Sequence, residues 1–390
     1  MLRDRYLTPN IVEDLKEKMV FVGGPRQVGK TTLCRDFVAS FFKRHAYYNW
    51  DNRADRKDIL KAAWPADAEL LIFDELHKYK AWKNLIKGEY DKLKNKYRFI
   101  VTGSARLNLY RRGGDSLQGR YHYYRLHPFS LAEITKGSVK ALPFKELFFS
   151  GDFFPNELES LHIYGGFPEP FIKQRQRHLR RWHNEKIERM FREDIQDLQV
   201  IRDIGSMKLL SDILPAKVGS LLSVNAIRED LEVSYRAAAH WIDVLESFYY
   251  HFRIYPYAGK RIRSLKKEPK LYLWDWSEVE DEAARFENMI ASHLLKFVHF
   301  LEDYEGYKAE LYFLRDVDKR EVDFIVTIDQ KPWFAVEAKA SDDRLSPSLL
   351  YFKARLKIPY LYQVLKKEGI DKLEKGARII SASRFLASLI

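Results

Sequence analysis

Two short runs early in the sequence combine residue types that bind a nucleoside triphosphate. Residues 24–31, GPRQVGKT, fit the pattern G-x-x-x-x-G-K-[ST] without a mismatch. In this pattern, backbone N–H groups surround the phosphates, the Lys30 ammonium reaches the β- and γ-phosphates, and the Thr31 hydroxyl holds Mg²⁺. The residues expected to bind the nucleotide are Gly24, Pro25, Arg26, Gln27, Val28, Gly29, Lys30, Thr31 and Thr32.

The second run, residues 68–76, AELLIFDEL, supplies the acids that a nucleotide hydrolase needs. Apolar residues that end in acid are typical of a buried parallel strand whose carboxyl end meets the ligand. We expect Asp74 to orient Mg²⁺ and Glu75 to polarise the attacking water. An acid directly after Asp74 favours hydrolysis over the small-molecule kinases that share the phosphate-binding loop.

A third apolar run, residues 97–105, ends in the polar residues Thr102, Gly103 and Ser104. We expect a polar side chain at this point to hydrogen-bond the γ-phosphate or the attacking water. Arginines follow, and one of them could stabilise charge in the transition state, from the same chain or from a neighbouring copy. These arginines are Arg106, Arg111, Arg112 and Arg120.

Another chemical pattern lies far along the chain, in the run DVDKREVDFIVTIDQKPWFAVEAKASDD, residues 316–343. Asp323 and Glu337 fall on two predicted neighbouring strands, and Lys339 shares a face with Glu337 because side chains alternate with a period of two. Two carboxylates and a lysine in this arrangement suit metal-assisted phosphodiester hydrolysis. The carboxylates would bind Mg²⁺ or Mn²⁺, and the lysine would position or activate water.

Each chemical pattern requires particular elements to position it. Residues 19–23 read as a buried strand, and the run after Lys30 has helical spacing, so the phosphate-binding loop lies between a strand and a helix. Residues 321–328 and 333–339 read as a hairpin with DQKP as its turn. Residues 285–303 have the spacing of a long amphipathic helix.

The ordered series GPRQVGKTTL, LLIFDEL, VTGSA and SLQGR…HPFSLAE resembles prokaryotic AAA-type ATPases of the branch that carries a C-terminal domain of unknown function. The run YGGFPEPF, residues 164–171, is similar to a motif found between the two parts. The resemblance covers nearly the whole chain. It implies ATP as the nucleotide, Ser104 as the polar sensor, Arg120 as the arginine near the end of the ATPase core, and assembly into a homo-oligomer.

The C-terminal pattern resembles the PD-(D/E)xK restriction-endonuclease-like fold. The resemblance implies one more acid from a preceding helix, and Glu287 stands at that position. The expected metal ligands are therefore Glu287, Asp323 and Glu337, with Glu337 and Lys339 as catalytic residues. This sequence has EVD where the family pattern has PD, and such domains also persist as inactive binding modules.

The middle of the chain is basic. Residues 171–194 hold many cations, interleaved with His178, Trp182 and His183, and we weigh a phosphate-contacting face against a solvated helix face. These cations are Lys173, Arg175, Arg177, Arg180, Arg181, Lys186, Arg189 and Arg192.

Residues 221–254 predict two helices with Ser234 as the N-cap of the second, and a basic hairpin follows. This order is typical of a winged helix, which binds DNA or packs against proteins. The candidate groove readers are Tyr235, Arg236 and His240, and the basic hairpin turn holds Lys260, Arg261, Arg263, Lys266 and Lys267.

The composition points to nucleic acid as the partner. Of the 390 residues, 67 are Lys or Arg and 55 are Asp or Glu, for a formal net charge of +12. The single cysteine, Cys34, excludes a disulfide within the chain and suits a reducing cytoplasm; we expect it to be a buried thiol on a helix face. The sequence shows neither a signal core nor an apolar run of membrane-spanning length, so we expect no membrane partner.

Together these patterns predict an α/β multidomain protein. The expected domains are an AAA-type P-loop domain with a parallel sheet and flanking helices (1–135), a basic helical linker (136–204), a winged-helix domain (205–270) and a restriction-endonuclease-like α/β domain (271–390). The predicted function is Mg²⁺-dependent ATP hydrolysis coupled to DNA binding or processing. The alternative is a nucleotide-dependent regulatory or assembly switch whose nuclease-like domain is inactive and binds protein.

Overall fold

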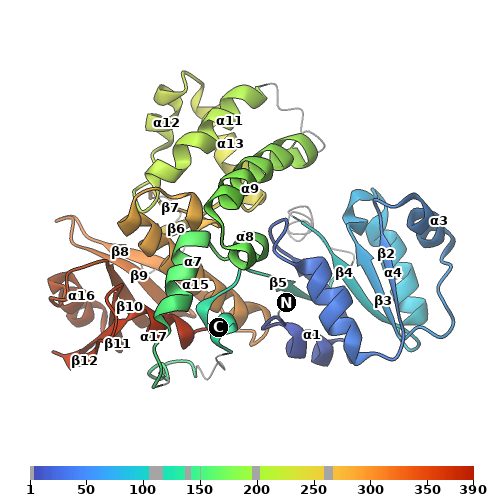
Figure 1. Cartoon of the computed structure of the whole chain (residues 1–390), viewed down its shortest axis with the longest axis horizontal. Helices are drawn as coiled ribbons and strands as arrows, with labels where there is room; N and C mark the ends of the chain where they lie inside the picture. The colour runs from blue at the N-terminus through green and yellow to red at the C-terminus, as the bar shows by residue number, and fades with distance from the viewer. Residues whose placement is uncertain (1–3, 105–116, 137–141, 150, 196–202, 259–266) are drawn as a thin grey trace. The chain divides into compact units, whose positions relative to one another are not determined.

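The computed structural model describes residues 4–104, 117–136, 142–149, 151–195, 203–258 and 267–390. The chain folds into two compact units, residues 1–127 and residues 128–390. The first unit runs from blue to teal in Figure 1 and the second from green to red. The first predicted domain boundary therefore lies close to the observed one, at residue 135 rather than 127.

The first unit is built on a five-stranded parallel sheet with the strand order β2-β3-β4-β1-β5. The central strands β3, β4 and β1 are buried almost throughout, as in a parallel sheet covered by helices, whereas the edge strands β2 and β5 are partly exposed. The phosphate-binding loop and the two acids follow β1 and β3, so they meet at the carboxyl edge of the sheet. The strands are β1 (Met19–Gly23), β2 (His45–Asn49), β3 (Leu70–Asp74), β4 (Arg98–Thr102) and β5 (Tyr121–Arg125).

Helices of the first unit bury the apolar faces of this sheet. On one face, Trp82, Ile86 and Tyr90 pack with Phe73 and Phe99 in a single apolar cluster. The segment after the phosphate-binding loop continues from α2 through a π turn (Leu33–Phe37) and a 3-10 turn (Val38–Phe41), and its buried positions include Leu33 and Val38. The α-helices are α1 (Thr8–Asp14), α2 (Lys30–Thr32), α3 (Arg53–Lys61) and α4 (Trp82–Leu93).

The second unit is organised by an eight-stranded mixed sheet with the order β12-β13-β11-β10-β9-β8-β6-β7. Strands β8, β9 and β10 form an antiparallel meander, and β11 joins β10 in parallel after helix α16. The strands are β6 (His251–Pro256), β7 (Lys270–Leu273), β8 (Ala309–Arg315), β9 (Glu321–Ile328), β10 (Lys331–Lys339), β11 (Tyr360–Leu365), β12 (Asp371–Glu374) and β13 (Ala377–Ser381).

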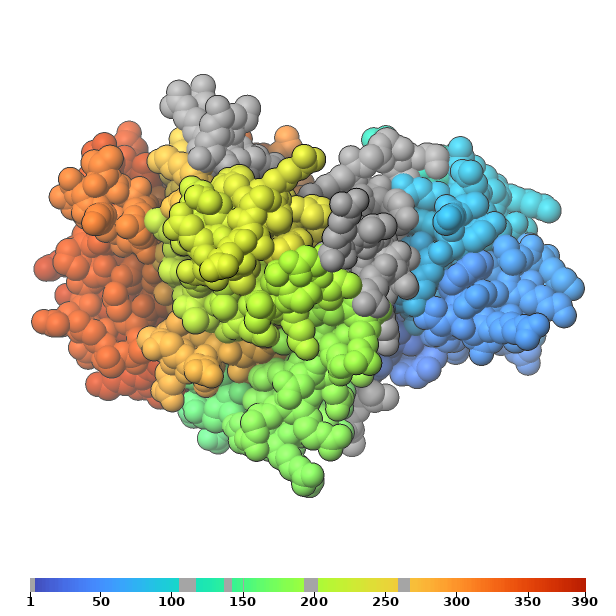
Figure 2. Space-filling model, turned by 90° about the horizontal axis from the view of Figure 1, so that it is seen from above, coloured from blue at the N-terminus to red at the C-terminus, as the bar shows by residue number. Residues whose placement is uncertain are grey.

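The helices of the second unit cover both faces of this sheet. Phe297 of α15 packs against Trp333 and Phe334 with tilted rings on one face, and α16 buries Leu349 and Phe352 on the other. The helices are α6 (Leu131–Thr135), α7 (Pro155–Tyr164), α8 (Pro168–Lys173), α9 (Gln176–Arg189), α11 (Ile204–Ile213), α12 (Val224–Asp230), α13 (Tyr235–Ser247), α15 (Glu282–Asp303), α16 (Pro347–Leu356) and α17 (Ala382–Ala387). Figure 2 shows the segments of α9 and α11–α13, in green and yellow, on the surface of this unit.

The predicted boundary between residues 270 and 271 falls inside strand β7. This strand pairs with β6 in antiparallel register, and β6 pairs in parallel with β8 through Tyr255↔Tyr312 and Pro256↔Phe313. The β6–β7 hairpin therefore extends the same sheet that carries the C-terminal carboxylates. The sequence patterns missed this continuity because strand pairing between residues about 57 positions apart leaves no local signal.

The glycines of YGGFPEPF allow a close approach within the second unit. A Cβ on Gly166 would lie 2.6 Å from the Phe129 carbonyl oxygen and 2.6 Å from Cη2 of Trp276. Gly165 has a φ of +72°, and a Cβ there would lie 2.7 Å from Oδ1 of Asp275. The motif thus lets the end of α7 sit directly against two other segments.

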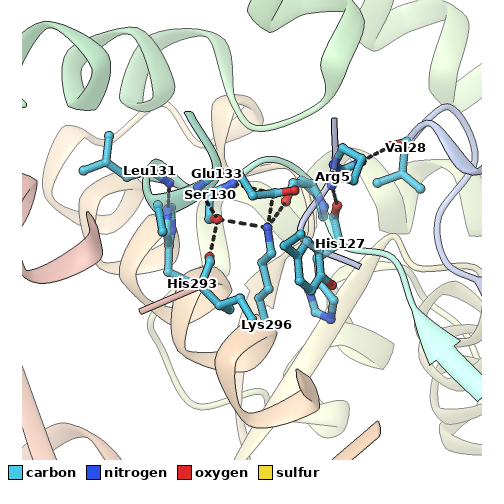
Figure 3. Close-up of polar contacts among 12 residues, drawn as sticks. Arg5, Val28, His127, Ser130, Leu131, Glu133, His293 and Lys296 are labelled. Atoms are coloured by element: carbon cyan, nitrogen blue, oxygen red, sulfur yellow. Dashed lines mark hydrogen bonds and ion pairs between the residues drawn. The ribbon is translucent and has the colours of Figure 1, made fainter. Parts of the chain in front are cut away.

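A buried polar network fixes the start of the second unit to helix α15. The Lys296 ammonium donates to Ser130 Oγ at 2.9 Å, to the Pro128 carbonyl at 3.2 Å and to the Glu133 carboxylate. His293 donates from Nδ1 to the Met289 carbonyl at 2.7 Å, and its Nε2 accepts from the Leu131 N–H at 3.0 Å. Figure 3 shows Lys296 and His293 reaching this segment from the same helix.

Candidate functional site

The loop after β1 adopts the backbone that phosphate binding requires. Gly24 and Gly29 have φ values of +145° and +98°, and a Cβ on Gly24 would collide with the Leu126 carbonyl oxygen. The Lys30 side chain is buried and donates to the carbonyl oxygens of Gly24 at 3.0 Å and Pro25 at 2.7 Å. The loop therefore holds the lysine folded back over its own backbone, at the start of helix α2.

An arginine near the start of the chain braces this loop. Buried Arg5 donates from one guanidinium nitrogen to the Val28 carbonyl at 2.8 Å and from another to the His127 carbonyl (Figure 3). The bond to Val28 fixes the middle of the loop, and the bond to His127 ties it to the segment that follows β5. Sequence reasoning missed Arg5 because it lies outside the loop motif.

Asp74 is the centre of a hydrogen-bond cluster at the carboxyl edge of the sheet. Its Oδ2 accepts from Thr31 Oγ1 at 2.7 Å and from the Tyr47 hydroxyl at 2.8 Å, and its Oδ1 accepts from the Thr102 hydroxyl. The sequence analysis singled out Thr31 and Asp74, and the structure brings them together. Tyr47 was missed, since a tyrosine in the middle of an edge strand gives no motif signal.

Glu75 leaves β3 in a left-handed conformation, with φ at +56°. Its N–H donates to the Thr102 carbonyl at 3.1 Å, and Oε2 lies 3.5 Å from His77 Nε2 and 3.7 Å from Lys78 Nζ. Burial raises the pKa of the Glu75 carboxyl, while the charges of Lys30 and Lys78 act in the opposite direction. A non-glycine residue in this conformation costs about 1 kcal/mol or more and is often found at functional sites.

The structure separates the other two predicted catalytic residues of this unit. Ser104 is buried just after β4, on the same edge of the sheet as Asp74. Arg120 precedes β5 and therefore lies at the opposite edge, where it forms a two-pronged pair with Asp91 at 2.7 and 3.0 Å. Within its own chain Arg120 does not reach the phosphate-binding loop. Arg106, Arg111 and Arg112 lie outside the described residues.

In the second unit the predicted acid pair and lysine lie together. The Lys339 ammonium is 2.9 Å from Oε1 of Glu337, as expected for two residues on one face of β10. Asp323 on β9 accepts from the Ala338 N–H at 2.9 Å. Burial, followed by the charge of Asp323, raises the pKa of the Glu337 carboxyl to about 7.

A lysine that sequence reasoning did not select lies within this carboxylate cluster. Lys270 Nζ is 2.6 Å from Glu321, 3.3 Å from Glu287 and 3.5 Å from Asp323. Tyr272 also donates to Glu287, at 2.7 Å. Burial, followed by the charge of Asp323, raises the pKa of the Glu287 carboxyl to about 7.

The predicted metal ligands do not fit a divalent ion in this arrangement. Among the described residues, one group of three ligand atoms lies within 4.8 Å of one another, and it is His183, Asp275 and Glu278 rather than the predicted set of Glu287, Asp323 and Glu337. Lys270 lies between Glu287 and Asp323, where a shared ion would have to bind. The His183 group is likewise filled by a lysine, because Lys186 donates to Asp275 at 2.9 Å and to Glu278.

The position of Lys186 corrects its assignment to the predicted phosphate-contacting face. Lys186 is held in a partly buried ion pair instead of facing a ligand, and the Trp182 ring is buried against Phe167 at 5.1 Å between ring centroids. The local charge pattern did not reveal this for Lys186, because its acidic partners lie about 90 positions away.

Four of the other cations of this segment line a basic hollow. It has a volume of about 660 Å³ and is lined by Ile172, Lys173, Arg175, Arg177, His178 and Arg181. Glu169 is its nearest acid partner, at 3.5 Å from Lys173 and 3.2 Å from His178. The hollow therefore keeps a positive balance.

The helix pair α12–α13 forms as predicted. Ser234 caps α13 by accepting from the Ala237 N–H at 3.1 Å. Tyr235 is 54% exposed, and Arg236 and His240 are also exposed. Of the basic hairpin turn, Lys267 is exposed, whereas Lys260, Arg261, Arg263 and Lys266 lie outside the described residues.

Comparison with known families identifies the first unit. A model of the AAA domain family matches residues 16–135. With the parallel sheet and the phosphate-binding loop, this match shows that the chain contains an AAA-type P-loop ATPase-like domain. Residues 155–278 and 283–385 match two families that are described as domains of unknown function, DUF8612 and DUF4143. The expected resemblance to AAA-type ATPases is thus confirmed for the first unit.

The two relatives that match most of this chain have names that assign them no activity. The chain is 22% identical over 342 residues to the uncharacterized proteins Rv2008c of Mycobacterium tuberculosis and Mb2031c of Mycobacterium bovis, covering 85% of this chain and 72% of each relative. Two RuvB variants of Thermotoga maritima align with 63% and 62% of this chain and with 87% and 86% of their own. Their TM-scores of 0.32 and 0.30, at 17% and 16% identity, are too low to indicate a shared fold or function.

No helix among the described residues is long and apolar enough to cross a membrane.

Proposed function

We propose that the protein is a Mg²⁺-dependent ATP hydrolase whose nucleotide state governs how its second unit engages DNA. The observation that carries the ATPase half is the direct bond between Thr31 Oγ1 and Asp74 Oδ2 at 2.7 Å. These two side chains are the magnesium-orienting pair of P-loop hydrolases. Their contact assembles the pair at the carboxyl edge of the sheet.

The residues present fit Mg²⁺-ATP. Thr31 and Asp74 would hold the ion, which neutralises charge on the β- and γ-phosphates when bound. Lys30 would leave the carbonyls of Gly24 and Pro25 and donate to the phosphates instead. Glu75 would accept a proton from the attacking water, and the raised pKa of its carboxyl makes it a stronger base for that role. Ser104 would hydrogen-bond the γ-phosphate or the water.

Arg120 is proposed to act on a neighbouring copy. It lies at the edge of the sheet away from its own phosphate-binding loop, beside a hollow of about 640 Å³ that also includes Lys18, Lys94 and Arg98. An arginine at this edge stabilises transition-state charge only if a second chain presents its nucleotide there. We therefore propose a homo-oligomer, and a molar mass measured with and without Mg²⁺-ATP tests it.

DNA engagement is supported by the basic hollow beside α9 and by the α12–α13 pair. The hollow presents Lys173, Arg175, Arg177 and Arg181. Two helices joined by residues 231–234 and followed by the β6–β7 hairpin have the order of a winged helix, whose second helix enters a DNA groove. On α13 the exposed Tyr235, Arg236 and His240 are the proposed base contacts.

The coupling is tested with a fluorescent DNA duplex and the full chain. Glu75→Gln with Mg²⁺-ATP is expected to bind DNA with an affinity different from that of the nucleotide-free protein, whereas Lys30→Ala shows no response to ATP.

The triple variant Arg175→Ala, Arg177→Ala and Arg181→Ala should reduce the slope of log affinity against log salt by about 2–3. Lys57→Ala with Lys61→Ala, on exposed positions of α3, is the control. Equal slopes for both variants and the wild type would contradict the DNA half.

A restriction-endonuclease-like binding domain without cleavage activity is the second candidate for the C-terminal residues. The order α15, β8, β9, β10, α16 and β11, with β10 and β11 parallel, supports a restriction-endonuclease-like core. The Glu337–Lys339 pair supports the same assignment. Because Lys270 occupies the place between Glu287 and Asp323, DNA incubated with Mg²⁺ or Mn²⁺ is expected to stay intact. Metal-dependent cleavage that is lost in Glu337→Ala would contradict this candidate and favour an active nuclease.

A further inference from the structure

The Lys270 ammonium lies inside the C-terminal carboxylate cluster as an internal counter-ion. Its side chain is 3% exposed, and three carboxylates surround it within 2.6–3.5 Å. Glu287 comes from α15, and Glu321 and Asp323 come from β9. A buried lysine with three acidic partners is held in its charged state by them.

The backbone around Lys270 is fixed on both sides. Lys270 pairs with Ile254 of β6, and a bridge joins it to Leu221. Asn288, which follows Glu287 on α15, makes two hydrogen bonds of 2.8 Å with the backbone of Leu273. Strand β7 is therefore locked against the helix that supplies one of the acids, and the lysine and Glu287 are positioned together.

The charges around the site require this lysine. Glu287, Glu321, Asp323 and Glu337 are four acids within one cluster, and Lys339 and Arg315 each pair with one of them, at 2.9 and 2.8 Å. Among the cations in the described part of the chain, it is Lys270 that contacts Glu287 and Asp323 together. Without it, two mutually repelling carboxylates would lie buried with no cation between them.

A divalent ion and the Lys270 ammonium cannot occupy this place at once. Mg²⁺ needs carboxylate oxygens at about 2.0–2.1 Å, so Glu287 and Asp323 would have to close on the point from which the ammonium now contacts both. We propose that Lys270 is a built-in cation that keeps divalent metal ions out of the C-terminal carboxylate cluster. The chain thereby meets the charge requirement of a nuclease-like site with its own side chain.

Metal exclusion is independent of ATP hydrolysis. It predicts that a variant without the Lys270 ammonium gains the ability to bind a divalent metal ion. Electron paramagnetic resonance of Mn²⁺ with the nucleotide-free full chain measures binding directly. Lys270→Met is expected to bind Mn²⁺ at least about tenfold more tightly than the wild type, since the acids that lose the ammonium are suitable ligands. Adding Asp323→Asn to Lys270→Met should remove this binding. Lys331→Met, at the exposed first residue of β10, is the control and should match the wild type.

Thermal unfolding gives a second readout for a variant that is less stable. Mn²⁺ should raise the melting temperature of Lys270→Met by several degrees and leave that of the wild type unchanged. Lys270→Arg retains a cation and should exclude Mn²⁺ as the wild type does. Two results would overturn the proposal: wild-type Mn²⁺ binding that Asp323→Asn abolishes, or a folded Lys270→Met that binds no more Mn²⁺ than the wild type.

Discussion

Thr31 donates its hydroxyl hydrogen directly to Asp74, with 2.7 Å between Oγ1 and Oδ2. The first residue belongs to the phosphate-binding loop and the second ends strand β3, 43 positions away. Tyr47 and Thr102 donate to the same carboxylate from two other strands. Three strands and the loop thus converge on one acid, which makes Asp74 the geometric centre of the proposed ATPase site.

Asp74→Asn should abolish the Mg²⁺ response of this site while leaving the fold intact. The amide oxygen still accepts hydrogen bonds from its neighbours, but the neutral side chain no longer attracts the ion. We expect the rate of ATP hydrolysis to fall by about 100-fold or more. The measurement is phosphate release at varied Mg²⁺, with the exposed Asp67→Asn as the control. Full activity in Asp74→Asn would remove this residue from the site.

Cys34 should be chemically silent in the folded protein. Its side chain is fully buried, and burial, followed by the charge of Asp74, raises the pKa of the thiol. A thiol-reactive dye at pH 8 is expected to label the native chain only over the timescale of unfolding. The same dye should label one thiol per chain in about 6 M guanidinium, because this concentration of denaturant unfolds most domains. Rapid labelling of native protein would contradict the buried helix-face position.

Gly166→Ala should destabilise the second unit. The new methyl group would lie 2.6 Å from both the Phe129 carbonyl oxygen and the Trp276 ring, so the packed segments must move apart. Overpacking of this kind typically costs about 1–3 kcal/mol. Chemical denaturation of Gly166→Ala and Gly151→Ala measures the effect. Gly151 has open space around its Cα, and its variant should be close to the wild type.

His293 should make the second unit less stable in acid. Burial lowers the pKa of this imidazole to about 4, and the charge of Lys296 also lowers it. The hydrogen bond to the Met289 carbonyl and the charge of Glu133 act in the opposite direction. An unfolded histidine has a pKa near 6.5, so the unfolded chain binds more protons between pH 6.5 and 4. The stability contribution is therefore complete above pH 6.5 and falls as the pH drops, by about 1–3 kcal/mol in total.

The pH effect of His293 is isolated by comparing variants. His162 and His251 have pKa values lowered to about 4 for the same reason, and the raised pKa values of Glu287 and Glu337 act in the opposite direction. These contributions cancel in the difference between the wild type and His293→Gln. That difference in unfolding free energy should be larger at pH 7.5 than at pH 5. A constant difference would show that His293 does not titrate as described.

Local patterns predicted the elements well where the signal was contiguous. The strand expected over residues 321–328 is β9 with the same bounds, and the helix expected over 285–303 lies within α15. Ser234 caps α13 as expected. Each of these depends on the spacing of apolar residues or on a cap next to the element, and such signals are present in a short stretch of sequence.

The residues that sequence reasoning misplaced have partners far along the chain. Lys186 reads as one cation in a basic run, yet it pairs with Asp275 and Glu278, which lie 89 and 92 positions away. Lys270 follows the basic hairpin turn, yet it pairs with Asp323, 53 positions on. Whether a lysine faces solvent, nucleic acid or a buried acid depends on tertiary pairing. A single sequence does not contain that information.

Phosphate release from Mg²⁺-ATP by the full chain tests the central proposal most directly. The wild type is expected to hydrolyse ATP in a Mg²⁺-dependent manner, with Glu17→Gln at an exposed position behaving identically. Lys30→Ala should lose nucleotide binding, because the ammonium no longer reaches the phosphates. Glu75→Gln should bind ATP and release phosphate at least about 100-fold more slowly, because no base polarises the water. Rates in Lys30→Ala and Glu75→Gln equal to that of the wild type would contradict the proposed ATPase site.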